Sequence, residues 1–258
     1  MTGPLLLADA PALLYRAFFG LPDSIKGADD RPVNALLGSV NAVLWCVERY
    51  DPRAVVLCFG QEAAVYRAEA YPPYHAQRPP MPDDLEADDL LGSLASIEEA
   101  AGGSALILTG DRDLFQCATD QVHVLLQQRG REGPEELGPA EVRGRYGIDP
   151  ALVPDFIALR GDPSDGIPGA KGIGEKTAAD LLRRHGSLEA AIEAAVREKP
   201  AVRKALLGQA EQLAMFKDLA TLRHVELERP ADAPLARDSG ADAAQALGMK
   251  RLAERLRA

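Results

Sequence analysis

Hydrophobic residues in the first half of the chain follow two alternating patterns. Short continuous apolar runs are typical of strands in a parallel sheet that is buried on both faces. Between these runs, apolar residues recur every three or four positions, from Val33 to Val47 and from Leu90 to Ile97, as on one face of a helix. The alternation predicts an α/β fold over residues 1–138, with a central mostly parallel sheet and helices on both faces. The expected strands cover residues 5–8, 53–59, 104–109 and 121–126.

The pattern changes after this α/β core. Residues 139–229 suggest short helices separated by Gly and Pro, residues 230–240 a linker, and residues 241–257 one amphipathic helix. We therefore expect three parts: the core, a helical region over 139–229, and a linker with a C-terminal helix packed on the core over 230–258. No run of about eighteen apolar residues is present, which argues against a membrane span.

Composition and charge narrow the class of protein. The chain has 258 residues, of which 47% are hydrophobic, and a net charge of −10. Its three cysteines stand far apart with no Cys-x-x-Cys pair, so we expect reduced thiols in a cytoplasmic protein. An acidic chain is not a typical nucleic-acid binder. However, several of its acids follow predicted strands, where a cation could neutralise them.

These acids gather at the ends of predicted strands, at a predicted helix start and in one turn. Each group has an ordinary explanation by itself, because acids stabilise the first turn of a helix and aspartates favour turns. Together they are expected on one rim, since the carboxyl ends of parallel strands line the binding crevice of an open α/β sheet. They are Asp9, Glu86, Asp88, Asp89, Asp111, Asp113, Asp162 and Asp165.

Carboxylates packed closely repel one another unless cations lie between them. Mg²⁺ and Mn²⁺ prefer oxygen ligands, and two such ions about 4 Å apart can activate a water and stabilise a leaving oxygen in phosphodiester hydrolysis. The four histidines show no ligand spacing, and no serine–histidine or cysteine–histidine arrangement offers a competing chemistry. The acids therefore point to a metal-dependent nuclease.

A second motif, Pro-Gly-Ala-Lys-Gly-Ile-Gly-Glu-Lys-Thr-Ala, spans residues 168–178 and is typical of a helix–hairpin–helix loop. Its glycines let the backbone approach a phosphate, the following helix offers free N–H groups, and its lysines add charge without base readout. The motif predicts binding to the DNA backbone. The residues expected to bind are Gly169, Lys171, Gly172, Gly174, Lys176 and Thr177.

With these motifs in this order, and with Tyr15-Arg16-Ala17-Phe18 after Asp9, the chain resembles the 5′-nuclease family over nearly its whole length. That family comprises the N-terminal domain of bacterial DNA polymerase I and stand-alone 5′-3′ exonucleases and flap endonucleases. The resemblance implies a PIN-like nuclease core, a helix–three-turn–helix DNA-binding module and two divalent-metal sites. The inner site would use Asp9, Glu86, Asp88, Asp89 and Asp111, and the outer site Asp113, Asp162 and Asp165.

The resemblance implies further roles. It places Arg67 and Arg78 near the scissile phosphate and Arg16 beside the first metal ligand, so we expect these three as catalytic residues. It also implies a K⁺ ion held by the backbone of Gly172, Ile173 and Gly174 in the helix–three-turn–helix. Since no polymerase follows residue 258, we expect the stand-alone form.

Three departures from the family pattern stand out. Gly60 follows the second strand where the family usually carries an Asp, and His75 stands where it often has a lysine. Only residues 79–85 separate the basic motif from Glu86, where the family has a few tens of residues that form a helical arch. Either the arch is truncated, or a disordered arch segment is missing from this numbering. Met81-Pro82-Asp83, which resembles the start of the arch helix, favours the second.

The sequence thus predicts a monomeric, bacterial, nucleoid-associated 5′ nuclease that acts in replication and repair on DNA flaps, nicks and 5′ ends. Two alternatives stay open. Gly60 and His75 would suit a non-catalytic protein that binds branched DNA. A nuclease directed at RNA primers would use the same acidic rim.

Overall fold

The computed structural model describes residues 3–60, 65–73, 87–128 and 133–258. A five-stranded sheet with the order β2-β1-β3-β4-β5 lies at its centre. The first four strands are parallel, and β5 is antiparallel to β4. The strands are β1 (Leu5–Asp9), β2 (Ala54–Cys58), β3 (Ala105–Thr109), β4 (Val122–Leu126) and β5 (Glu135–Leu137). The four predicted strands and the mostly parallel sheet are confirmed. The three-residue β5 was not predicted, because Glu-Glu-Leu carries no strand pattern.

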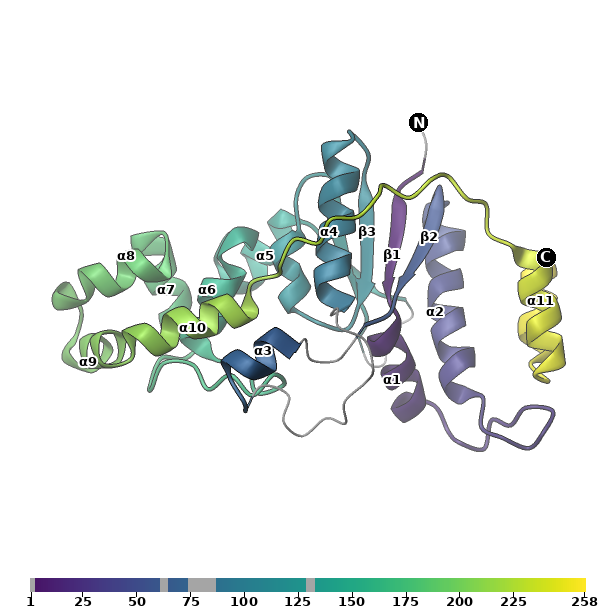
Figure 1. The fold of residues 1–258 in the computed structure, drawn as a ribbon, viewed down its shortest axis with the longest axis horizontal. Helices are drawn as coiled ribbons and strands as arrows, with labels where there is room; N and C mark the ends of the chain where they lie inside the picture. The colour runs from purple at the N-terminus through teal and green to yellow at the C-terminus, as the bar shows by residue number, and fades with distance from the viewer. Residues whose placement is uncertain (1–2, 61–64, 74–86, 129–132) are drawn as a thin grey trace.

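Helices cover both faces of the sheet and form the rest of the molecule (Figure 1). The helices near the sheet are α1 (Ala10–Gly20), α2 (Asn34–Tyr50), α3 (Val65–Ala70) and α4 (Ala87–Ala100). Those that follow the sheet are α5 (Pro139–Tyr146), α6 (Val153–Arg160), α7 (Glu175–His185), α8 (Leu188–Glu193), α9 (Pro200–Gly208), α10 (Ala210–Ala220), α11 (Arg237–Ala246) and α12 (Lys250–Arg257). Short 3-10 helices are η1 (Asp113–Cys117), η2 (Pro150–Leu152) and η3 (Ala194–Arg197).

Alternate residues along the central strands point to opposite faces, and both faces are buried. Leu5, Leu7 and Ile107 pack with Leu91 and other residues of α4. Leu6, Ala8, Leu106 and Leu108 pack on the other face with residues of α1 and α2. Burial on both sides explains why these strands are almost wholly apolar.

The helices α5 to α10 form a second packed unit that continues from the sheet. Its core holds the fully buried rings of Phe156 and Phe216, and it is continuous with Phe115 of η1 and Val124 of β4. Figure 1 shows α7 to α10 at the opposite end of the molecule from α11. The predicted helical character of residues 139–229 agrees with these elements.

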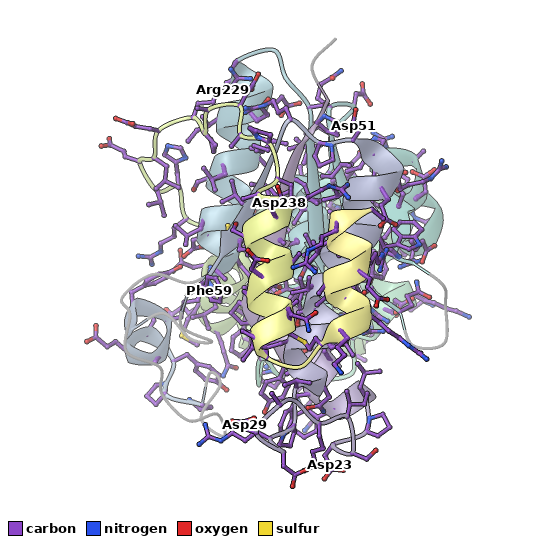
Figure 2. All side chains as sticks on the ribbon, turned by 90° about the vertical axis from the view of Figure 1, so that its right-hand side faces the viewer. Asp23, Asp29, Asp51, Phe59, Arg229 and Asp238 are labelled. Atoms are coloured by element: carbon purple, nitrogen blue, oxygen red, sulfur yellow. The ribbon has the colours of Figure 1, made fainter. Side chains whose placement is uncertain are left out.

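The segment 221–236 has no regular structure and runs from α10 across the amino ends of the strands to α11 (Figure 1). The expected single helix over 241–257 is wrong, because two helices, α11 and α12, lie side by side against α2 (Figure 2). The break falls at Gly248, whose φ of 80° favours glycine. A Cβ there would also lie 2.5 Å from the backbone nitrogen of Ala28. No helix in the described part of the chain is long and apolar enough to cross a membrane.

Candidate active site

The first acidic residue joins two strands at the carboxyl edge of the sheet. Asp9 is the last residue of β1, is only 4% exposed, and caps α1 by accepting a hydrogen bond from the backbone N–H of Ala12 at 3.0 Å. The hydroxyl of Thr109, the last residue of β3, donates to Asp9 Oδ2 at 2.6 Å. The two strand ends therefore hold this carboxylate in a fixed orientation.

The same hydroxyl orders the acids that follow β3. The backbone N–H of Asp111 donates to Thr109 Oγ1 at 2.9 Å, and that of Asp113 donates to Asp111 Oδ1 at 3.0 Å. Asp113 begins η1 and is buried. A chain of hydrogen bonds thus leads from Asp9 through Thr109 to both aspartates.

A turn after α6 brings two more acids to this edge. The backbone of Asp162 pairs with that of Ile167 through two hydrogen bonds of 2.8 Å, and its carboxylate accepts from the backbone and hydroxyl of Ser164. Arg160 Nη2 lies 3.1 Å from Asp162 Oδ2. Asp165, in the same turn, is buried.

Asp88, in the first turn of α4, completes what we call the acidic cluster. Its members are Asp9, Asp88, Asp111, Asp113, Asp162 and Asp165. Burial, and then the charges of Asp111 and Asp9, raise the pKa of Asp88 well above its ordinary value. Burial, and then the charges of Asp111 and Asp165, do the same to the pKa of Asp113.

Burial and the charge of Asp165 raise the pKa of Asp111 to about 6, with smaller contributions from Asp9 and Asp162. Each shift includes charges from distant parts of the chain, so the six carboxylates share one electrostatic environment. The sequence-predicted convergence of acids is therefore seen for these six residues.

A groove of about 1380 Å³ opens over five of the six carboxylates, all except Asp113. Basic and aromatic side chains line it beside the acids: Arg16, Arg112, Arg160, Tyr15 and Phe19. The rings of Tyr15 and Phe19 lie 4.9 Å apart, and both side chains are exposed. A ligand in this groove would meet carboxylates, guanidinium groups and aromatic rings together.

Asp89, which was predicted as a metal ligand, points away from the cluster. It accepts hydrogen bonds from Arg67 Nη2 at 2.9 Å, from the Tyr66 hydroxyl at 2.8 Å and from the backbone N–H of Arg223 at 2.9 Å. Arg67, predicted near the scissile phosphate, is 2% exposed and pairs with this carboxylate. Successive residues of a helix differ in direction by about 100°, so Asp88 and Asp89 face different neighbours.

Two predicted site residues, Glu86 and Arg78, lie outside the described residues, as do His75 and the segment 79–85. Gly60 lies just after β2, in which Cys58 pairs with Asp9 across the sheet. The position where the family usually carries an Asp is therefore at the same edge as the acidic cluster.

The structure also identifies site residues that the sequence patterns did not predict. Thr109, Ser164 and Arg160 hold or neutralise cluster carboxylates, and Arg112 lines the groove. A signal existed for Thr109, which is a polar residue at the end of an apolar run. Arg160 had a weaker signal, since it stands directly before Gly161-Asp162.

The predicted hairpin adjoins the acidic cluster through two glycines. Gly169 has a φ of 70°, and a Cβ there would lie 2.4 Å from the backbone nitrogen of Gly161, next to Asp162. Gly174 is the N-cap of α7, and Ile173 is buried. Lys171, Gly172, Gly174 and Lys176 are exposed, and Thr177 is partly so. The loop therefore presents glycine backbone and two ammonium groups to solvent, with the acids close behind it.

Comparison with known proteins agrees with this architecture. A family model described as the 5′-3′ exonuclease N-terminal resolvase-like domain matches residues 4–86 and 84–147, and one described as the 5′-3′ exonuclease C-terminal SAM fold matches residues 148–239. A 5′-3′ exonuclease of Mycobacterium tuberculosis is 35% identical over 250 residues, which cover 80% of this chain and 78% of that protein. The thermostable DNA polymerase I of Thermus aquaticus is 37% identical over 247 residues, which cover 86% of this chain but only 29% of the polymerase.

Two sets of solved structures share the fold. The T5 5′-exonuclease with bound divalent metal ions (zinc) superposes with a TM-score of 0.70 at 18% identity, covering 98% of this chain and 96% of that one. The catalytic core of Rad2 in complex with DNA substrate gives 0.64 at 12% identity, covering 99% and 93%. The order of motifs, the sheet with its acidic edge and the two family models agree, and the chain belongs to the 5′-3′ exonuclease family.

Proposed function

We propose that this chain hydrolyses DNA phosphodiester bonds at or near a 5′ end, as a 5′-3′ exonuclease and flap endonuclease that depends on divalent cations. The observation that carries the proposal is the acidic cluster, in which burial and then the charges of neighbouring acids raise the pKa values of Asp88, Asp111 and Asp113. Such a site is costly to fold, and it becomes favourable when cations bind between the carboxylates.

Divalent cations fit the cluster in charge and in donor type. All six donors are carboxylates, which suits hard ions such as Mg²⁺ or Mn²⁺. Among the described residues, no three acidic, histidine or cysteine side chains already form a finished ligand set. We propose that Asp9, Asp88 and Asp111 hold one ion and Asp113, Asp162 and Asp165 a second. When bound, such ions activate water and stabilise the leaving oxygen.

Other residues of the site orient the carboxylates or bind the substrate. The Thr109 hydroxyl fixes Asp9, and the Asp113 N–H fixes one oxygen of Asp111. Arg16, Arg112 and Arg160 line the groove, where guanidinium groups can pair with phosphate oxygens.

Tyr15 and Phe19 offer exposed aromatic rings for an unpaired base at the end of a duplex. The named relatives and the T5 and Rad2 structures support DNA as the substrate class.

The hairpin would dock the duplex part of a branched substrate. Exposed Gly172 and Gly174 allow close approach of a phosphate, and Lys171 and Lys176 supply charge. In keeping with the family resemblance, we place a K⁺ ion on the backbone carbonyls around Gly172 to Gly174. We propose a monomer that acts on DNA flaps, nicks and 5′ ends, including 5′ ends that begin with RNA.

Replacement of Asp111 by Asn tests the active site. With a labelled 5′-flap DNA and Mn²⁺, Asp111→Asn should lower the cleavage rate on the order of 10³-fold, because the cluster loses a charged ligand. Binding of the flap DNA by the metal-free protein should persist. Asp120→Asn, an exposed acid between β3 and β4, is the matched control and should cleave normally.

Two outcomes would contradict the proposal. Cleavage by Asp111→Asn at nearly the normal rate would remove the acidic cluster from the chemistry. A wild-type protein that shifts flap DNA in a gel but yields no product with Mn²⁺ or Mg²⁺ would instead favour the non-catalytic DNA-binding protein that Gly60 suggests.

A further inference from the structure

The basic residues of the chain are distributed unevenly. Residues 1–138 contain 10 Lys and Arg against 21 Asp and Glu, whereas residues 139–229 contain 14 of each. Within this helical unit, many cations are already matched. Arg184 pairs with Asp180 and Glu198, and Lys217 pairs with Asp155 and Glu189. These side chains hold helices together and have little charge left for a ligand.

Six other cations of the unit are different: Arg197 of η3 and five that we call the basic track, Lys171, Lys176, Lys199, Arg203 and Lys204. All five are exposed. In the part of the chain that the structure describes, none of the five forms a side-chain ion pair or side-chain hydrogen bond. Two of them belong to the hairpin motif, but the other three lie on α9 or directly before it, where no motif predicted a function.

A hydrogen bond joins the two halves of the basic track. The backbone N–H of Lys171 donates to Gln209 Oε1 at 2.8 Å, and Gln209 is the C-cap of α9. The hairpin loop therefore lies against the C-terminal end of that helix. Lys204 stands five residues before Gln209. At a rise of 1.5 Å per residue, this is about 8 Å along the helix axis, or roughly two steps of a DNA strand.

The orientation of α9 places these charges outward. Ala205 and Leu206 are buried against the rest of the unit, while Arg203, Lys204 and Leu207 are exposed. Lys199 and Arg203 are four residues apart and share a helix face. Glu175 and Glu198 are the nearest acids in sequence to the two halves. Neither forms an ion pair with the basic track, and Glu198 pairs instead with Arg184.

We propose that the basic track is one continuous binding surface for duplex DNA, on which a strand docked at the hairpin continues along α9. Lys199, Arg203 and Lys204 neutralise phosphates of that strand, without contact to the bases. The inference rests on the proposed role of the hairpin in docking DNA, and it extends the contact beyond the motif. The proposed surface lengthens the sequence-independent contact between the protein and the duplex arm of a branched substrate.

The test measures how DNA binding depends on salt. The double variant Arg203→Gln/Lys204→Gln is compared with Lys171→Gln/Lys176→Gln and with Lys250→Gln/Arg251→Gln, a matched loss of two exposed charges at the start of α12. The probe is a fluorescein-labelled duplex with a 5′ flap, in EDTA, between about 50 and 200 mM NaCl. Each lost phosphate contact lowers the slope of log K against log salt by about 0.9.

For the α9 variant, we expect the slope to fall by about 2 and affinity at low salt to fall about tenfold. The α12 variant should match the wild type, and Arg203→Lys/Lys204→Arg should keep the wild-type slope. At saturating DNA, the cleavage rate of the α9 variant with Mn²⁺ should be unchanged, since these residues lie outside the groove.

An unchanged salt slope in the α9 variant, beside a reduced slope in the hairpin variant, would overturn this inference and leave the proposed function intact. If neither variant changed the slope, docking at the hairpin would fail as well. Melting curves of the variants should coincide with the wild-type curve, because the substituted side chains are exposed and make no ion pairs.

Discussion

Carboxylates at the two edges of the sheet have pKa values that are shifted in opposite directions. At the amino edge, Glu98 is 1% exposed, and burial by itself would raise its pKa. Hydrogen bonds from Arg229 and Arg53 outweigh that effect and lower the pKa below its ordinary value. At the carboxyl edge, Asp113 is also buried and Asp88 is half-buried, but the charges that act most strongly on them are those of acids, and their pKa values are raised.

At the amino edge, ion pairs and hydrogen bonds attach the segment 221–236 to Glu98 of α4 and to Arg53. Arg53 Nη2 lies 2.5 Å from Glu98 Oε2, and Arg229 donates to both oxygens of Glu98 at 2.8 and 2.9 Å. Arg53 also donates to the carbonyl of Pro230 and to Asp232, each at 2.8 Å. Figure 2 shows Arg229 and Asp51 toward the same end of the molecule, above the helices α11 and α12.

At the amino edge, the buried carboxylate is balanced by arginines of the same chain and stabilises the fold. At the carboxyl edge, under the proposed function, the carboxylates bind cations. Glu98 has its cations supplied by the chain, so the pair stabilises the native state without help. In the acidic cluster, Arg160 lies beside Asp162, but the charges that act most strongly on Asp88, Asp111 and Asp113 are those of other acids. Under the proposed function, divalent cations that bind between these carboxylates supply the positive charge.

The largest expected effect is at the amino edge. Glu98→Gln leaves two guanidinium groups without their carboxylate and should lower the free energy of unfolding by about 3 kcal/mol. Urea unfolding would measure it, with Glu254→Gln on exposed α12 as the control. Equal stability of the two variants would mean that the network does not hold the segment 221–236.

A smaller effect is expected from pH at the carboxyl edge. The folded metal-free protein keeps a proton on Asp111 up to about pH 6, whereas the unfolded chain releases it near its ordinary value of 3.8. This contribution to stability is full below pH 3.8 and is lost as pH rises to about 6. The full shift corresponds to about 3 kcal/mol, and because Asp111 is partly exposed, the stability of wild type relative to Asp111→Asn should fall by less than this across that window. A difference that stays constant with pH would contradict the raised pKa.

The smallest expected effect distinguishes neighbouring acids of α4. Asp88→Asn should stabilise the metal-free protein by about 1 kcal/mol, because it removes a buried charge from the cluster. It should also reduce the rise in melting temperature that Mn²⁺ gives the wild type. Asp89→Asn should instead destabilise the protein, since it weakens the pair with Arg67. The opposite signs would be measured by thermal unfolding with EDTA and with Mn²⁺, and equal signs would refute the contrast.

Much of the site followed from sequence because parallel strands impose it. An acid that ends a buried strand must lie at the carboxyl edge, whatever the rest of the fold does, and this placed Asp9 and Asp111 correctly at one rim. The Gly-rich hairpin was equally readable, since a left-handed φ at Gly169 and Gly172 permits few other residues.

Only the tertiary structure shows which side of each helix contacts which neighbour. The segment 221–236 covers one side of α4, where Arg223 N–H binds Asp89, Val225 N–H binds Ser93, and Arg229 binds Glu98. No local sequence pattern could show that Arg223, more than 130 positions away, would bind Asp89 while Asp88 lines the groove.

By itself, then, the sequence determined the four parallel strands, the acids at their ends, the hairpin and the family, because each depends on local backbone geometry or on an ordered set of motifs. Only the tertiary structure decided which acids face other acids, which face arginines, and which of the described cations form no ion pair. Charge compensation depends on side chains meeting across long sequence separations, and the spacing of residues along a chain does not encode which of them will meet.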